Sequence, residues 1–208
     1  MLGKILGAEA REVGHGDHEG RRARVVVASR TYDTDPDDLW DALTSAERIP
    51  LWFLPVSGDL DVGGRYQLEG NAGGTITRCV PPWAFEVTWE FGGEGGFVSV
   101  GLMGRVDGTR LTLEHILPIG ADDTHWAQYG PGAVGVGWDL ALVGLGLYLE
   151  AGSVEKAEVA AWMEADPGKA FIRDSAAAWG ETHIAGGADP EVARAMAGRT
   201  AEAYAGPA

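Results

Sequence analysis

The chain has 208 residues, 45% of them hydrophobic, and its 31 acidic and 16 basic residues give a formal net charge of −15. Such a negative field repels phosphates and anionic lipid headgroups, which argues against a nucleic acid or a membrane as partner. The length suits one domain with additional elements, able to bury a core without disulfides or metals. The single cysteine, Cys79, cannot form an internal disulfide, so we expect a cytoplasmic protein. Cys79 lies in a strand-like run, where a small core residue is expected rather than a nucleophile.

The first part of the chain combines a polar segment with the start of a folded domain. Residues 1–23 are rich in glycine, histidine and charge, and we expect them to be poorly ordered. Residues 24–32 are rich in β-branched side chains and predict a strand. Asp35 and Pro36 then supply an N-cap and a first helical position, which predicts a helix directly after that strand.

Residues 56–116 show the period-two alternation of half-buried strands. In residues 85–91 apolar and polar side chains alternate at every position. Glycine-containing turns at 63–64 and 107–108 separate some of these strands and indicate hairpins. The pattern predicts a curled antiparallel sheet of about six or seven strands with one face exposed to solvent.

The most apolar stretch is residues 133–149, which follow an expected loop at 118–131. Its length approaches that of a membrane span, but Asp139 interrupts it and no basic flank anchors it, so we expect a buried helix. Glycine in a helix costs about 1 kcal/mol relative to alanine, so the glycines here indicate either close packing on the sheet or room for a cavity. These glycines are Gly135, Gly137, Gly144 and Gly146.

Residues 151–208 read as three further helical segments. They carry large apolar side chains, among them Phe171, Trp179, Met196 and Tyr204. Leaving these in water costs about 25 cal/mol per Å² of apolar surface, so we expect the extension to pack on the domain. A homodimer contact is the alternative use of the same residues.

The order of elements and several motifs resemble a known superfamily. A strand, two short helices, a curled sheet and a long helix are similar to the helix-grip, START-like (SRPBCC) proteins. Within it, residues 24–150 resemble the activators of heat-shock-protein-90 ATPase homologues. The resemblance lies in Arg30, Trp-Asp-Ala-Leu at 40–43, Trp-Phe at 52–53, Gly-Gly-Arg-Tyr at 63–66 and the strand at 108–115. It implies an α+β helix-grip fold, a curled antiparallel sheet around a long helix, here with extra C-terminal helices.

The resemblance leaves the activity open, because a fold does not fix a function. The eukaryotic namesakes of the family are co-chaperones, and some relatives in the wider group are polyketide cyclases or aromatases. The sequence has no phosphate-binding glycine loop, nucleophile elbow or paired His-Glu zinc motif. We therefore assign no catalytic residue and expect neither a metal nor a cofactor.

Strand alternation provides the candidate binding residues. Leu111, Leu113 and His115 share one face of their strand, which we expect to point inward. His115 is then a core histidine bonded to backbone, a polar anchor in a cavity, or a general acid or base. Tyr66 points inward by the same argument.

Trp89 and Trp138 are large enough to flank the same space, as core residues or as part of a ligand site. The candidate ligand-binding residues are Tyr66, Trp89, Leu113, His115 and Trp138. The favoured hypothesis is a module that binds a small apolar or aromatic molecule between sheet and long helix. The alternatives are a cyclase-like or hydrolase-like enzyme acting in that cavity, which requires two or more converging polar side chains, and a co-chaperone-type protein interaction.

Overall fold

The strands form one antiparallel sheet in the order β1-β2-β8-β7-β6-β5-β4-β3. The structure is a computed structural model and describes residues 7–120 and 123–206. The strands are β1 (Ala10–His18), β2 (Arg21–Tyr32), β3 (Val56–Gly58), β4 (Arg65–Leu68), β5 (Gly73–Val80), β6 (Ala84–Phe91), β7 (Glu94–Arg105) and β8 (Gly108–Pro118).

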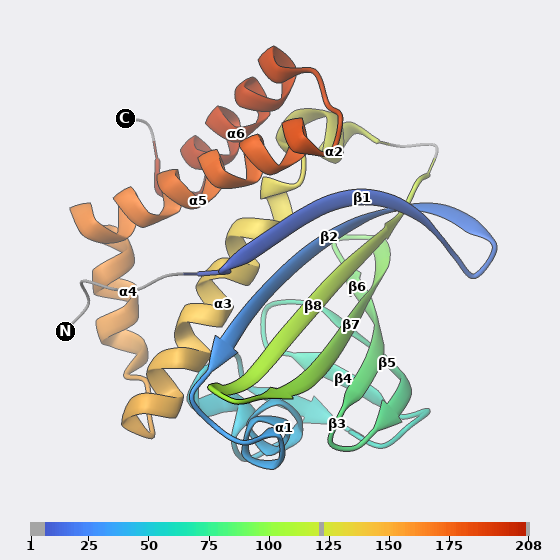
Figure 1. Cartoon of the computed structure of the whole chain (residues 1–208), viewed down its shortest axis with the longest axis vertical. Coiled ribbons are helices and arrows are strands. Elements are labelled where there is room, and N and C mark those ends of the chain that lie inside the picture. Colours follow the sequence, from blue (N-terminus) through green and yellow to red (C-terminus); the bar gives the residue numbers. More distant parts are fainter. Residues whose placement is uncertain (1–6, 121–122, 207–208) are drawn as a thin grey trace.

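The sheet curls around one side of the long helix α3, and the C-terminal helices lie on the other side of it (Figure 1). The helices are α1 (Pro36–Thr44), the 3₁₀ turn η1 (Ile49–Leu51), α2 (Thr124–Tyr129), α3 (Gly132–Ala151), α4 (Lys156–Glu164), α5 (Asp166–Ala185) and α6 (Pro190–Ala205). This is the α+β helix-grip fold, and that prediction is confirmed.

Local signals in the sequence explain where several elements begin. The side chain of Asp35 accepts a hydrogen bond of 2.9 Å from the backbone N–H of Asp38, and Pro36 opens α1. Asp189 caps α6 in the same way, with Pro190 at its first position. In both helices the cap satisfies a backbone donor that the helix itself leaves unpaired.

The N-terminal segment differs from the prediction. Within residues 1–23, which we expected to be poorly ordered, Ala10–His18 forms β1 and pairs with β2 along its whole length. Its glycines and charged residues give no apolar alternation, yet backbone pairing needs none. Over the described residues the sheet therefore has eight strands rather than the predicted six or seven. Residues 1–6 lie outside the described residues.

The expected loop at 118–131 also contains structure. Thr124–Tyr129 forms the short helix α2, which Gly130 ends with a positive φ of 62°. Such a φ is readily adopted only by glycine, which makes it a common helix terminator.

Helix α3 is the core helix of the fold. Among the described residues it is the one helix long and apolar enough to cross a membrane, but more than half of its apolar stretch is buried within the molecule. A Cβ atom at Gly135 would lie 2.3 Å from the indole of Trp179 on α5, and one at Gly144 would lie 2.8 Å from the carbonyl oxygen of Trp52. The glycines thus permit close packing, and at Gly135 the partner is α5 instead of the sheet.

A buried carboxylate on α3 joins the N-terminal strand β1 and helix α5 to the core helix. Asp139 is fully buried and forms an ion pair of 2.9 Å with Arg11 of β1. It also accepts hydrogen bonds from the backbone N–H of Ala8 (2.7 Å), the Ser175 hydroxyl (2.5 Å) and the Trp179 indole (3.1 Å). Ser175 and Trp179 lie one helical turn apart on α5, so that helix is fixed to α3 at two points.

Replacing Asp139 with alanine should therefore destabilise the whole fold. The change leaves Arg11 and three other donors without their acceptor, and breaking such a buried ion pair typically costs about 3–5 kcal/mol. Denaturant unfolding should show this loss. The control is Glu181→Ala on α5, which removes an exposed pair with Arg194 and should cost less than about 1 kcal/mol. Equal effects of the two changes would contradict the assigned role of Asp139.

Candidate functional site

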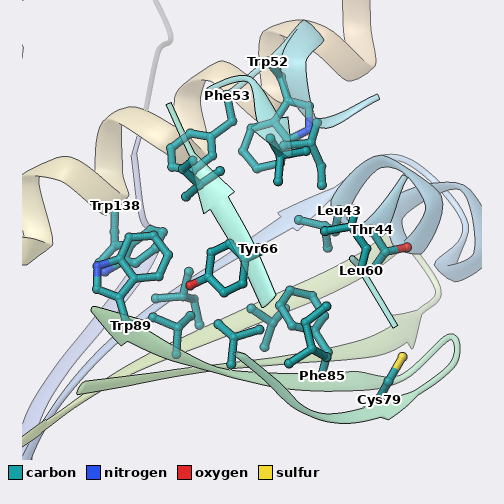
Figure 2. A pocket seen from close by; sticks show the side chains of 18 residues that line it. Leu43, Thr44, Trp52, Phe53, Leu60, Tyr66, Cys79, Phe85, Trp89 and Trp138 are labelled. Carbon is teal, nitrogen blue, oxygen red and sulfur yellow. The ribbon is translucent and has the colours of Figure 1, made fainter. Parts of the chain in front are cut away.

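A cavity of about 170 Å³ lies between the concave face of the sheet and the elements that cover it (Figure 2). Its wall is almost entirely apolar and includes six aromatic side chains. The lining residues are Leu43, Thr44, Ile49, Trp52, Phe53, Val56, Leu60, Tyr66, Leu68, Ile76, Cys79, Phe85, Val87, Trp89, Val98, Val100, Leu113 and Trp138.

The floor of the cavity follows from strand register. Val100 pairs with Leu113 of β8 on one side and with Phe85 of β6 on the other. Directly opposite residues of an antiparallel pair share a face, so these three side chains lie together. The alternation predicted from the sequence thus gives the sheet an apolar concave face.

The roof is the segment between α1 and β3, which carries Ile49, Trp52 and Phe53. Figure 2 shows Trp52 and Phe53 beside helix α3. The Trp52 indole donates a hydrogen bond of 2.9 Å to the carbonyl oxygen of Ala42. These contacts hold large apolar side chains over the sheet.

Arg48 fixes this roof segment to two helices. Its guanidinium forms ion pairs with Asp38 (2.8 Å) and Asp41 (2.9 Å) of α1, and it donates to the Tyr148 hydroxyl of α3 (2.7 Å). Because Arg48 bridges α1 and α3, the roof is tied to both sides of the cavity.

One end of the cavity is formed by two tryptophans in front of a histidine. The ring centroids of Trp89 and Trp138 are 5.0 Å apart, and those of His115 and Trp138 are 5.8 Å apart. The Trp138 indole N–H donates to Nδ1 of His115 at 3.1 Å. Nδ1 is therefore unprotonated, and the proton of the neutral ring is on Nε2. Burial lowers the pKa of His115 to about 4, so the ring is neutral at neutral pH.

Tyr66 occupies the middle of the cavity. Its hydroxyl donates a hydrogen bond of 2.8 Å to the carbonyl oxygen of Thr88. Burial raises the pKa of Tyr66, with a smaller contribution from Glu90, so the phenol stays protonated. The group facing the cavity is a hydroxyl and not a phenolate.

Four of the five predicted binding residues line the cavity: Tyr66, Trp89, Leu113 and Trp138. The fifth, His115, is 3% exposed and lies behind Trp138, outside the lining formed by the described residues. Tyr66 and His115 each have a hydrogen-bond partner within the fold.

Sequence reasoning missed the roof and one end of the cavity. The Trp-Phe pair at 52–53 was a family motif, but its sequence neighbours do not show that it faces the sheet. Cys79, expected as a core residue, is exposed and borders the cavity. β4 pairs with β5 only at residues 73–75 of β5. The later part of β5, which contains Cys79, therefore has no strand beside it on that side. Within the described residues, no three His, Cys, Asp or Glu side chains are placed to hold a metal ion.

Comparison with solved structures shows the same architecture in other proteins. CalU16 from Micromonospora echinospora is 30% identical; its crystal structure covers 84% of this chain and 98% of its own, with a TM-score of 0.66. The solution structure of CalU16 covers 86% and 97%, with a TM-score of 0.72. The solution structure of the Aha1 dimer from Colwellia psychrerythraea is 17% identical, covers 62% of this chain and 97% of its own, and has a TM-score of 0.51, a likeness of fold alone.

Among curated proteins, none matches the sequence significantly. The sequence model of the family described as "Activator of Hsp90 ATPase homolog 1-like protein" matches residues 33–150, which is more than half of the chain. The likeness to CalU16 extends over a larger share of the chain, so it includes residues outside that range. By this match over more than half of its length, the protein belongs to the activator of Hsp90 ATPase homolog 1-like family.

Proposed function

We propose that the protein binds a small, uncharged apolar or aromatic molecule in the cavity between the sheet and helix α3. The observation that carries this proposal is the cavity of about 170 Å³ with six aromatic side chains in its wall. An apolar protein cavity of about 150 Å³ holds one benzene molecule, so the volume here suits a single substituted ring. The free thiol of Cys79 supports a reducing, cytoplasmic location for this binding.

Two observations favour binding over catalysis in this cavity. An enzyme would need converging polar side chains, and the two candidates, Tyr66 and His115, are each engaged by another group of the fold. His115 is also held neutral with Nδ1 occupied, which disfavours its use as a general base. A co-chaperone-type interaction would need an exposed patch, for which the acidic run from Asp33 to Asp41 is the candidate. In the fold this run has local roles, since Asp35 caps α1 while Asp38 and Asp41 pair with Arg48.

Toluene should bind in the cavity and change the tryptophan fluorescence, because Trp52, Trp89 and Trp138 line the wall. Replacing Val100 with phenylalanine fills part of the space and should weaken toluene binding at least about tenfold, or 1.4 kcal/mol. A fluorescence titration, repeated by calorimetry, measures the affinity of each variant.

The matched control is Met103→Phe, which introduces the same ring on the same strand at a side chain that is 62% exposed. It should leave toluene binding unchanged. If the protein does not bind toluene, or if the two variants bind it equally well, a small aromatic ligand in this cavity is ruled out.

Acid should destabilise the fold partly through His115. Its pKa is about 4 in the folded protein and 6.5 ordinarily, so between these pH values only the unfolded chain takes up this proton. The free energy of unfolding should therefore fall as the pH drops through this window, by about 3 kcal/mol in total from this residue. Unfolding midpoints measured from pH 7 to pH 4 should be less acid-sensitive in His115→Leu than in the unsubstituted protein.

His115→Leu also leaves the Trp138 indole N–H without its acceptor. At neutral pH this variant should therefore lower the free energy of unfolding by about 1–3 kcal/mol. His125→Leu, at an exposed histidine, should keep the acid dependence of the unsubstituted protein. An identical acid dependence in His115→Leu and the unsubstituted protein would show that His115 is not held neutral by burial.

A further inference from the structure

The polar groups around the cavity limit the charge of its ligand. None of the described residues that line it carries a charged side chain. Burying a carboxylate without a cation or several hydrogen-bond donors is strongly unfavourable. The net charge of −15 on the whole protein adds to this, because it repels anions before they reach the site. The cavity therefore matches a neutral molecule.

The lining hydroxyls have already donated their protons. Tyr66 donates to the carbonyl oxygen of Thr88 at 2.8 Å, and Thr44 donates to that of Trp40 at 2.8 Å. A hydroxyl that has donated keeps lone pairs with which it can accept. Towards a ligand, both groups therefore act as hydrogen-bond acceptors, and the ligand must bring the donor.

The indole N–H groups of the wall differ from one another. Those of Trp52 and Trp138 donate within the fold, to Ala42 and to His115. Within the part of the chain that the structure describes, the Trp89 ring contacts those of His115 and Trp138, and its indole N–H donates no such hydrogen bond. A ligand hydroxyl both donates and accepts, so it matches an acceptor oxygen together with one N–H.

Of the two hydroxyls, that of Tyr66 lies at the aromatic end. Figure 2 shows its oxygen directed toward Trp89 and Trp138, whereas Thr44 lies at the opposite end beside Leu43. A ligand ring placed between the aromatic side chains brings a ring substituent to the Tyr66 oxygen. Because Tyr66 stays protonated, this oxygen does not become an anion that would bind a cation instead.

We infer that the cavity selects a neutral phenol, an aromatic ring bearing one hydroxyl group, and that the Tyr66 oxygen accepts the hydrogen bond of that hydroxyl. This rests on the proposed function, since it specifies the chemical class of the molecule in the same cavity. Tyr66 is then the residue that determines specificity, while the apolar wall provides most of the affinity.

The experiment compares four ligands of similar size by calorimetry at neutral pH: toluene, 4-methylphenol, 4-methoxytoluene and 4-methylbenzoate. The phenol should bind about five- to tenfold more tightly than toluene, the effect of one net hydrogen bond. The methyl ether cannot donate and should have no such advantage. The benzoate should bind at least about 100-fold more weakly than the phenol, because its charge would be buried without a partner.

Two variants locate the acceptor. Tyr66→Phe should remove the preference for 4-methylphenol over toluene, because it keeps the ring and removes only the acceptor oxygen. Thr44→Val removes the other lining hydroxyl and should leave the preference intact. The toluene affinity of each variant reports whether its cavity is still formed, and the comparison of phenol and ether in the unsubstituted protein needs no variant at all.

The outcomes separate this inference from the proposed function. Absence of toluene binding to the unsubstituted protein would overturn the proposed function, and the phenol site with it. Toluene binding with equal affinities for phenol and ether would overturn only the phenol selectivity. A preference that survives Tyr66→Phe would overturn the assignment of Tyr66 as the acceptor.

Discussion

The contacts of the buried Asp139 carboxylate determine how strand β1 and helix α5 are placed against helix α3. An isolated charge in the interior would be prohibitively costly, and here Arg11 neutralises it while three further donors complete its shell. These four partners come from the segment before β1 (Ala8), from β1 itself (Arg11) and from α5 (Ser175 and Trp179), which are elements far apart in the sequence. A single side chain in the middle of α3 thereby requires strand β1 and helix α5 to be in place together. Apolar packing alone would not specify the position of either element so narrowly.

The same helix turn also forms part of the cavity wall. Trp138 directly precedes Asp139, and successive residues of an α-helix point about 100° apart. One side chain consequently faces the cavity while the next faces Arg11 and α5. The C-terminal extension, although it lies outside the span of the family model, thus helps to set the rotation of the helix that carries Trp138. Loss of the Asp139 contacts would be transmitted to the cavity through this one turn.

The sequence predicted the fold well because its main signals are local. Period-two alternation predicted the strands in which Leu113 and Trp89 point toward the core. Asp35 and Asp189 marked the starts of two helices. Strand β1 was missed because Gly14, Gly16 and its charged residues carry no alternation, and its stability comes from pairing with β2 and from Arg11. The roof could not be predicted either, since its position depends on long-range contacts such as that between Arg48 and Tyr148. Likewise, alternation placed His115 inward, but only the structure shows that Trp138 occupies its Nδ1.

The site is neutral although the protein as a whole is highly charged. Burial keeps His115 deprotonated and Tyr66 protonated, so each of these residues is held in its uncharged form by the same physical cause. In such an apolar cavity, buried contact area contributes to the affinity of any ligand of suitable size. Contact area alone therefore gives little selectivity between ligands of the same shape. A buried polar atom distinguishes them better, because a ligand that leaves it unpaired loses the free energy of desolvating it. Selectivity in this cavity must therefore come from the few oxygen and nitrogen atoms of its wall.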